Sequence, residues 1–179
     1  GGRPRLIPEC KPRNQHVTLT PSPASPLVAL DWIALERQLD QDGCALIRTL
    51  LRPETCDRLS ALYPHSEPFR SQVIMAHHGF GRGEYKYLRY PLPSVVERLR
   101  SALYPRLVPL ANRWQERMGL LERFPAQHSE FLERCHAAGQ LRPTPLLLQY
   151  GPQDYNCLHQ DLYGEHVFPL QVAILLSEP

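Results

Sequence analysis

The alternation of hydrophobic and polar positions predicts two helices and a strand in the first part of the chain. Apolar side chains recur at helical spacing from Asp31, a capping residue, until Gly43, a residue type that commonly ends helices. A short apolar run at residues 44–50 then predicts a strand. Pro53 fits the first turn of a further helix at residues 52–63, where its missing N–H group is not needed.

The next apolar runs predict a β-hairpin. Residues 69–76 and 84–90 are typical of strands, and the glycine-rich segment 77–83 joins them. This segment also suggests a phosphate-binding loop, but a strand follows it rather than a helix, and the G-x-G-x-x-G spacing is absent. A hairpin turn is therefore the better interpretation.

Helical spacing returns at residues 94–118, where Pro105 and Pro109 should divide the segment into two short helices. Another helix is predicted at residues 126–138, with Gly139 at its end. Strand-like spacing follows, and we expect strands at residues 146–150, 155–162 and 167–176. Helices first and strands afterwards predict an α+β fold, with a helical layer against a largely antiparallel sheet.

The chain divides into three predicted regions. Residues 1–29 are rich in proline and poor in apolar clusters, and we interpret them as an arm. Residues 30–145 form a helical support region with a hairpin at residues 70–90, and residues 146–179 hold the first strands of the core. Because the chain stops directly after an apolar run, we expect a domain truncated at its C-terminus.

Composition excludes several classes of protein. With 179 residues and 42% hydrophobic content, the chain can bury a core of its own. No apolar run is long enough for a membrane span and no signal peptide is visible, so a cytoplasmic protein is expected. The five cysteines include no CxxC pair, which is typical of reduced thiols rather than a disulfide framework. A net charge of +2 does not by itself indicate a polyanionic partner.

His159 and Asp161 lie two residues apart in a predicted strand. Alternate residues of a strand point to the same side, so an imidazole and a carboxylate can bind one ion there. A further histidine would complete a facial triad, which leaves positions open and suits Fe(II) that binds a cosubstrate and oxygen. With eight histidines in the chain, the pattern also arises by composition. A zinc cluster with Cys157 and His166 is a further alternative.

The flanking residues make the motif more specific. The run LLLQYGP at residues 146–152, followed by LHQD at residues 158–161, resembles the strand pair of the iron(II)- and 2-oxoglutarate-dependent dioxygenases, above all the alkylation-repair branch. The runs at residues 85–93 and 139–150 are similar to a bacterial family of these oxygenases thought to act on damaged DNA.

The resemblance implies roles for individual residues. His159 and Asp161 would be iron ligands, and Tyr150 would hydrogen-bond 2-oxoglutarate. The family's distal histidine and its carboxylate-binding arginine are expected beyond Pro179. The alkylation-repair enzymes usually have asparagine two residues before the tyrosine, where this chain has Leu148. That departure implies a different contact to the cosubstrate or a different substrate branch.

The resemblance also implies a fold and a reaction. The fold would be a double-stranded β-helix, or jelly roll, behind an N-terminal helical layer. The reaction would use Fe(II), 2-oxoglutarate and oxygen, with ascorbate as an optional reductant, to hydroxylate a C–H bond; on an N-methyl group of damaged DNA it would release formaldehyde. Two alternatives stay open: a protein hydroxylase of the prolyl type, and a cupin-like protein that binds a metal or ligand without catalysis.

The second hairpin strand carries a candidate substrate contact. Tyr85, Tyr87 and Arg89 share one face, and Lys86 and Tyr90 lie on the other. Aromatic rings with basic groups between them can stack on single-stranded or extruded bases, so we expect this hairpin to contact damaged or single-stranded DNA. A sheet face packed on the helical layer explains the same pattern equally well.

Overall fold

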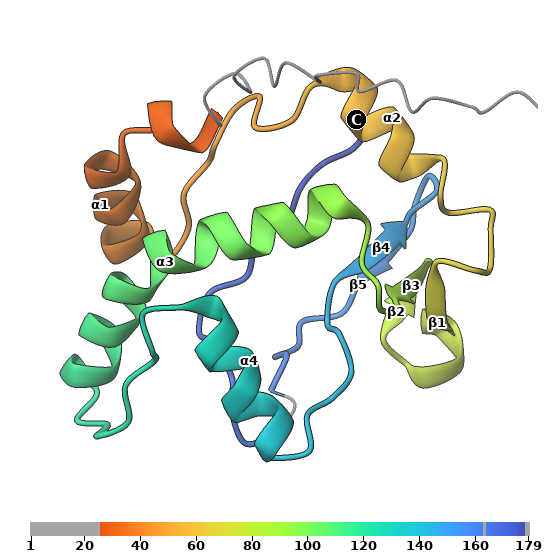
Figure 1. The fold of residues 1–179 in the computed structure, drawn as a ribbon. Helices are drawn as coiled ribbons and strands as arrows, with labels where there is room; N and C mark the ends of the chain where they lie inside the picture. Colours follow the sequence, from red (N-terminus) through yellow and green to blue (C-terminus); the bar gives the residue numbers. More distant parts are fainter. Residues whose placement is uncertain (1–25, 163, 178–179) are drawn as a thin grey trace, which may run out of the picture.

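The computed structural model describes residues 26–162 and 164–177, and its elements mix helices with antiparallel strands. In chain order they are η1 (Pro26–Ala29), α1 (Trp32–Asp42), α2 (Pro53–Ser60), β1 (Phe69–Ile74), η2 (Met75–His78), β2 (Gly81–Arg82), β3 (Glu84–Leu88), α3 (Ser94–Arg117), α4 (His128–Ala137), β4 (Leu146–Gln149) and β5 (Tyr155–Asn156). In Figure 1, α3 crosses the middle of the molecule, with α1 at one side and the strands at the other. The predicted α+β class is confirmed.

Helix α1 begins and ends where its sequence predicts. The Asp31 carboxylate accepts a hydrogen bond of 3.0 Å from the backbone N–H of Ala34, which satisfies one of the open donors of the first turn. Gly43 ends the helix with φ = 71°, a left-handed conformation that costs glycine little. Helix α2 likewise begins at Pro53. Helix α4 is two residues shorter at its start than predicted.

The strand predicted at residues 44–50 is wrong. This segment is irregular, and Thr49 adopts a positive φ of 57° in a turn. Leu46 is 68% exposed, so the apolar run does not face a core here. No neighbouring strand pairs with the segment among the described residues, and a strand without a partner cannot satisfy its backbone hydrogen bonds.

The predicted division of residues 94–118 into two helices is also wrong, since α3 is continuous over 24 residues. Pro105 and Pro109 lie four residues apart and are both exposed, so the carbonyl groups that lose an N–H partner face solvent. The opposite side buries five side chains along the helix: Leu103, Tyr104, Val108, Leu110 and Ala111. This burial holds the helix together across both prolines.

The hairpin is confirmed, and it belongs to a sheet with the strand order β1-β3-β4, antiparallel throughout. One face of this sheet meets the helical layer, where Phe69, Leu88 and Leu92 are buried and Leu147 packs against them. The hairpin loop adds the short strand β2, which pairs with β5. The loop after β1 is thereby tied to the segment that precedes His159.

The strands predicted at residues 155–162 and 167–176 are largely wrong: only Tyr155–Asn156 is a strand, and the rest is irregular. Apolar alternation predicts a side that can be buried, but it supplies no partner strand. Phe168 and Leu170 pack against the helices instead, whereas Leu158 and Leu162 are exposed. Closure of the described sheets into a jelly roll stays a prediction, as does the division at residues 29 and 145; most of the predicted arm lies outside the described residues.

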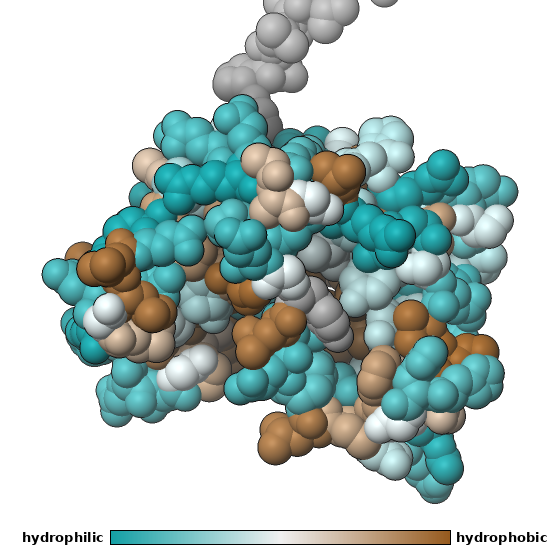
Figure 2. Space-filling view, turned by 90° about the horizontal axis from the view of Figure 1, so that it is seen from below, coloured by the Kyte–Doolittle hydropathy of each residue, from teal (hydrophilic) through white to brown (hydrophobic). Residues whose placement is uncertain are grey.

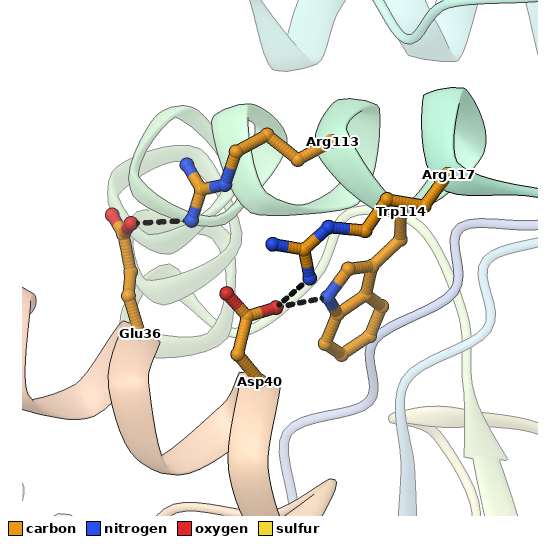
Figure 3. Close-up of polar contacts among 5 residues, drawn as sticks. All are labelled: Glu36, Asp40, Arg113, Trp114 and Arg117. Atoms are coloured by element: carbon orange, nitrogen blue, oxygen red, sulfur yellow. Dashed lines mark hydrogen bonds and ion pairs between the residues drawn. The ribbon is translucent and has the colours of Figure 1, made fainter.

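Helices α1 and α3 are joined by a cluster of polar side chains (Figure 3). Asp40 accepts hydrogen bonds from the indole Nε1 of Trp114 at 2.6 Å and from Arg117 at 3.0 Å. Glu36 pairs with Arg113 at 2.7 Å. The indole hydrogen bond is the main cause that lowers the pKa of Asp40 below its ordinary 3.8; burial opposes it, and the Arg117 charge lowers the pKa further.

An aromatic cluster fixes the rest of the helical layer. Tyr104, Phe124, Phe131 and Phe168 meet with ring centroids 5.0–6.0 Å apart, so side chains from α3, the α3–α4 loop, α4 and the C-terminal segment share one core. Elsewhere, large apolar side chains are scattered over the surface. In Figure 2 they form small separate groups among hydrophilic residues.

Two amide side chains each hold a loop by a pair of backbone hydrogen bonds. Asn112 on α3 bonds both the N–H and the carbonyl of Phe124, at 2.8 and 3.0 Å. Gln140, just after α4, bonds both groups of His166, at 2.8 and 3.1 Å. Each amide thus supplies the backbone hydrogen bonds that a neighbouring strand would otherwise give to that residue.

Candidate functional site

His159 and Asp161 lie in an irregular stretch just after β5, not in the strand predicted for them. Their side chains nevertheless converge, with His159 Nε2 3.7 Å from Asp161 Oδ1. Both side chains are nearly half exposed, at 47% and 43%. We call residues 157–171 the motif segment; residue 163 within it lies outside the described residues.

The ring of His159 is held by its other nitrogen. Nδ1 lies 2.8 Å from the carbonyl oxygen of Cys157. A carbonyl can only accept, so Nδ1 carries a proton, and in the neutral imidazole the lone pair is then on Nε2, the nitrogen 3.7 Å from Asp161 Oδ1. This is the tautomer that a metal-binding histidine needs, and a carbonyl at Nδ1 is a common way to fix it.

Asp161 is held in the corresponding way. Its Oδ2 accepts a hydrogen bond of 3.2 Å from the amide of Gln171, which leaves Oδ1 facing the imidazole. Gln171 was missed by the sequence reasoning, because the apolar alternation around it predicts a strand and says nothing of a contact ten residues back. Each candidate ligand therefore has one atom anchored and one atom available.

The available atoms fit a metal ion. A nitrogen and an oxygen bound to one transition metal at about 2.1 Å each lie roughly 3 Å apart at right angles, so 3.7 Å is closed by small side-chain rotations. Among the described residues no group of three or more His, Cys, Asp or Glu side chains converges. The zinc cluster of Cys157, His159 and His166 is thus not formed there; His166 Nδ1 pairs instead with Glu122 at 3.3 Å.

Tyr150 follows β4 and lines an open pocket of about 400 Å³. Its ring packs so closely on Gly83 that a Cβ there would come within 2.7 Å of it. Burial, and then the Asp154 carboxylate, raises the pKa of the Tyr150 hydroxyl, which therefore stays a hydrogen-bond donor. The lining includes the carboxylates of Glu84 and Asp154 and no cationic side chain, so it does not by itself complement a dianion such as 2-oxoglutarate.

The face predicted for Tyr85 and Tyr87 is confirmed: their rings meet edge to face, with centroids 5.5 Å apart. It is not the face packed on the helical layer, because Lys86 points there, with Nζ 4.5 Å from the Tyr63 ring centroid and 2.8 Å from the Tyr63 carbonyl oxygen. Arg89 lies just beyond the end of β3 and is exposed. The sequence reasoning missed Arg70, whose guanidinium lies 4.2 Å above the Tyr87 ring.

Comparison with known proteins adds to this geometry. A family model described as "oxygenase, catalysing oxidative methylation of damaged DNA" matches residues 83–179, the region from β3 through the motif segment. Two uncharacterized proteins of Mycobacterium tuberculosis, MT2286 from strain CDC 1551 / Oshkosh and Rv2227 from strain H37Rv, are each 55% identical to this chain over 89 residues. That match covers 50% of this chain and 38% of each relative. No solved structure was found to match.

None of the helices in the described ranges has both the length and the apolar character needed to cross a bilayer.

Proposed function

Since this chain belongs to the family of oxygenases that act on damaged DNA, we propose that it is an iron(II)- and 2-oxoglutarate-dependent dioxygenase that hydroxylates a C–H bond in DNA. The observation that carries this proposal is the pair of half-anchored ligands, His159 and Asp161. If the histidine and the carboxylate were neighbours by chance, we would not expect both Nδ1 of the ring and Oδ2 of the carboxylate to have a hydrogen-bond partner. The rest of the site is proposed to lie in a jelly-roll core, to which β1, β3 and β4 contribute strands.

The residues present fit an iron ion. His159 Nε2 and Asp161 Oδ1 would hold Fe(II) from one side and leave adjacent positions open. When bound, the metal supplies oxygen activation, with 2-oxoglutarate and O₂ consumed, succinate and CO₂ released, and R–H converted to R–OH. Cys157 and Gln171 keep the two ligands aimed at the same point, so that little side-chain entropy is lost when the metal binds.

The cosubstrate site is proposed on narrower grounds. The Tyr150 hydroxyl can donate one hydrogen bond to a carboxylate of 2-oxoglutarate, as the resemblance of its motif implies. Glu84 and Asp154 in the same lining oppose an anion, so the counter-charge for 2-oxoglutarate would come from a cation outside this lining. Tyr150 orients the cosubstrate, and the acidic groups restrict where its carboxylates can lie.

The proposed substrate is a methylated base in DNA. Hydroxylation of an N-methyl group gives a carbinolamine, which loses formaldehyde and restores the base. The face formed by Tyr85 and Tyr87 suits an unpaired base, because π-stacking tolerates any base.

The test is an anaerobic titration with Fe(II) and 2-oxoglutarate of the protein with its natural C-terminus, in which the expected distal histidine and arginine are present, followed by the visible metal-to-ligand charge-transfer band. We expect the band in the wild type and its loss in His159→Ala and Asp161→Ala. A matched control is His136→Ala, which removes an exposed histidine on α4 and should leave the band intact. Oxygen is then admitted, and succinate and formaldehyde are measured with methylated single-stranded DNA.

The outcomes separate the alternatives. A band together with formaldehyde release from DNA supports the whole proposal. A band with succinate formation only on a peptide substrate would replace DNA by protein. Metal binding without succinate on any substrate would indicate a cupin-like binding protein. No band in the wild type would overturn the iron proposal.

A further inference from the structure

A second pocket, of about 220 Å³, lies along β1, which is an edge strand of the three-stranded sheet. Its lining differs in charge from the pocket at Tyr150: it contains two cationic side chains, Arg70 and Lys86, and no carboxylate. The remaining lining residues are mostly small or polar: Ser66, Phe69, Ser71 and Gln72. A pocket with this composition selects for an anion.

In the described part of the chain neither cation forms an ion pair with a carboxylate within 4 Å, and the Glu84 carboxylate beside the pocket accepts a hydrogen bond of 2.9 Å from Gln72. Lys86 Nζ donates to the carbonyl of Tyr63 and lies over the rings of Tyr63 and Phe69, at 4.5 and 5.5 Å from their centroids. Arg70 donates from Nε to the carbonyl of Pro143 at 3.3 Å. Both groups are thus positioned by carbonyls and aromatic rings, which fix a cation without cancelling its charge.

Both cations keep donors for a ligand. An ammonium group has three N–H donors, and the carbonyl of Tyr63 uses one of those on Lys86. A guanidinium has five, of which Pro143 and Ser71 use two on Arg70. Burial, and the nearby Arg142 charge, lower the pKa of Arg70, against an opposing effect of Tyr87, which marks a partly desolvated cation. An oxyanion bound there would stabilise this charge.

Arg70 also connects the pocket to the aromatic face. A register shift in the β1–β3 pairing lies between Phe69 and Ser71, at Arg70, which frees this side chain from the regular alternation of the strand. Its guanidinium covers the ring of Tyr87, which in turn contacts Tyr85. A DNA strand bound along the edge strand β1 would therefore run directly to the rings of Tyr85 and Tyr87.

We propose that the pocket of Arg70 and Lys86 binds a backbone phosphate of single-stranded DNA and places the adjoining base against Tyr85 and Tyr87. This inference rests on the proposed DNA substrate and adds a phosphate site outside the iron centre. Arg70 contacts the phosphate and shapes the base-binding face, whereas Lys86 contacts the phosphate only.

The first experiment measures binding of a fluorescein-labelled single-stranded oligonucleotide to the full chain, without iron, over a range of salt concentrations. Arg70→Gln and Lys86→Gln each remove one cation; the control Arg37→Gln removes an exposed charge on α1, at the other end of the molecule. We expect each pocket variant to bind roughly three- to tenfold more weakly and to remove part of the slope of about 0.7 in log K against log salt that one phosphate contributes. The control should match the wild type.

The second experiment replaces one phosphate at a time by a neutral methylphosphonate. At one position the wild type should lose more than Arg70→Gln loses with normal DNA, and the double variant Arg70→Gln/Lys86→Gln should lose nothing more there. If both pocket variants bind DNA as tightly as the wild type, with the same slope of log K against log salt, the phosphate site is overturned. The proposed function would still stand. No DNA binding by the wild type would overturn the DNA substrate and this site together, whereas the iron titration would be unaffected. Thermal unfolding of each variant excludes loss of the fold as the cause.

Discussion

The helical layer and the motif segment are built in opposite ways. The helical layer, helices α1 to α4, is held by an aromatic core in which Tyr104 and Phe124 are buried, and by the cluster around Asp40. The motif segment has no regular structure and carries Leu158 and Leu162 exposed. It is held by the Gln140 amide, by the insertion of Phe168 and Leu170 into the helical core, by hydrogen bonds within the segment itself, and by single contacts of Cys157 with Phe80 and of His166 with Glu122.

The difference shows which contacts fix the positions of side chains in each region. In the helical layer many apolar contacts are shared, so no single polar contact decides the geometry. In the motif segment two hydrogen bonds, one from His159 to the Cys157 carbonyl and one from the Gln171 amide to Asp161, decide where both candidate ligands point. Stability and function should therefore respond to different substitutions, and this contrast can be tested.

The largest effect should come from the aromatic core. Phe124→Ala removes a ring that contacts Phe131 and Phe168, and we expect a loss of about 3–5 kcal/mol in the free energy of unfolding, a large part of the total for a domain of this size. Denaturant unfolding measures it. Phe124→Leu, which keeps most of the volume, should lose much less. Equal losses would mean that the cluster is not tightly packed.

The next effect should fall on metal affinity and leave stability alone. Gln171→Leu removes the hydrogen bond to Asp161 Oδ2 and frees that carboxylate to rotate, so we expect roughly 10- to 100-fold weaker Fe(II) binding. The unfolding midpoint should stay unchanged. Gln38→Leu, an exposed glutamine on α1, is the matched control. Unchanged iron affinity in Gln171→Leu would remove this residue from the site.

The two amide contacts allow a direct comparison between the regions. Asn112→Ala leaves the backbone groups of Phe124 without partners inside the helical layer, and we expect a global loss of about 1–3 kcal/mol. Gln140→Ala does the same to His166, but there the motif segment should loosen locally, with a smaller global loss and faster amide exchange at His166. Equal global losses would contradict the division into a stable layer and a weakly held segment.

The smallest effect concerns pH. The folded-state pKa of Asp40 is depressed, so its stabilising contribution is present above the ordinary value of 3.8 and is lost as pH falls through the lower folded value. Asp40→Asn should be slightly less stable than the wild type at neutral pH, and the difference should shrink below pH 3.8. Asp42→Asn, on the same helix outside the cluster, is the control. A difference independent of pH would show that the charge is not involved.

Local signals were predicted well from the sequence, and signals that depend on a distant partner were not. Asp31 and Gly43 bound α1 because capping is decided within a few residues. The rule that proline breaks a helix failed at Pro105 and Pro109, since the buried side of α3 outweighs two lost hydrogen bonds on its exposed side. The strand predicted at residues 44–50 failed because a strand also needs a neighbour.

The same distinction holds within the candidate site. The pairing of His159 with Asp161 was predicted from a strand that is absent; in the irregular segment the hydrogen bonds to Cys157 and from Gln171 orient the two side chains instead. The contact of Gln171 with Asp161, and the stacking of Arg70 on Tyr87, depend on chain paths that no local pattern encodes. The roles of Tyr150 and Arg89 stay predictions.

The two-residue bridge between β2 and β5 has a consequence for the order of events during folding. It pairs Gly81 with Asn156, and the next residue, Cys157, bonds the Phe80 carbonyl at 2.8 Å and offers its own carbonyl to His159. The bridge closes a loop of about 75 residues, so its entropy cost is met only once the intervening helices have formed. We therefore expect the imidazole to be aimed late, so that the nascent chain does not hold the candidate ligand pair in place before its scaffold exists.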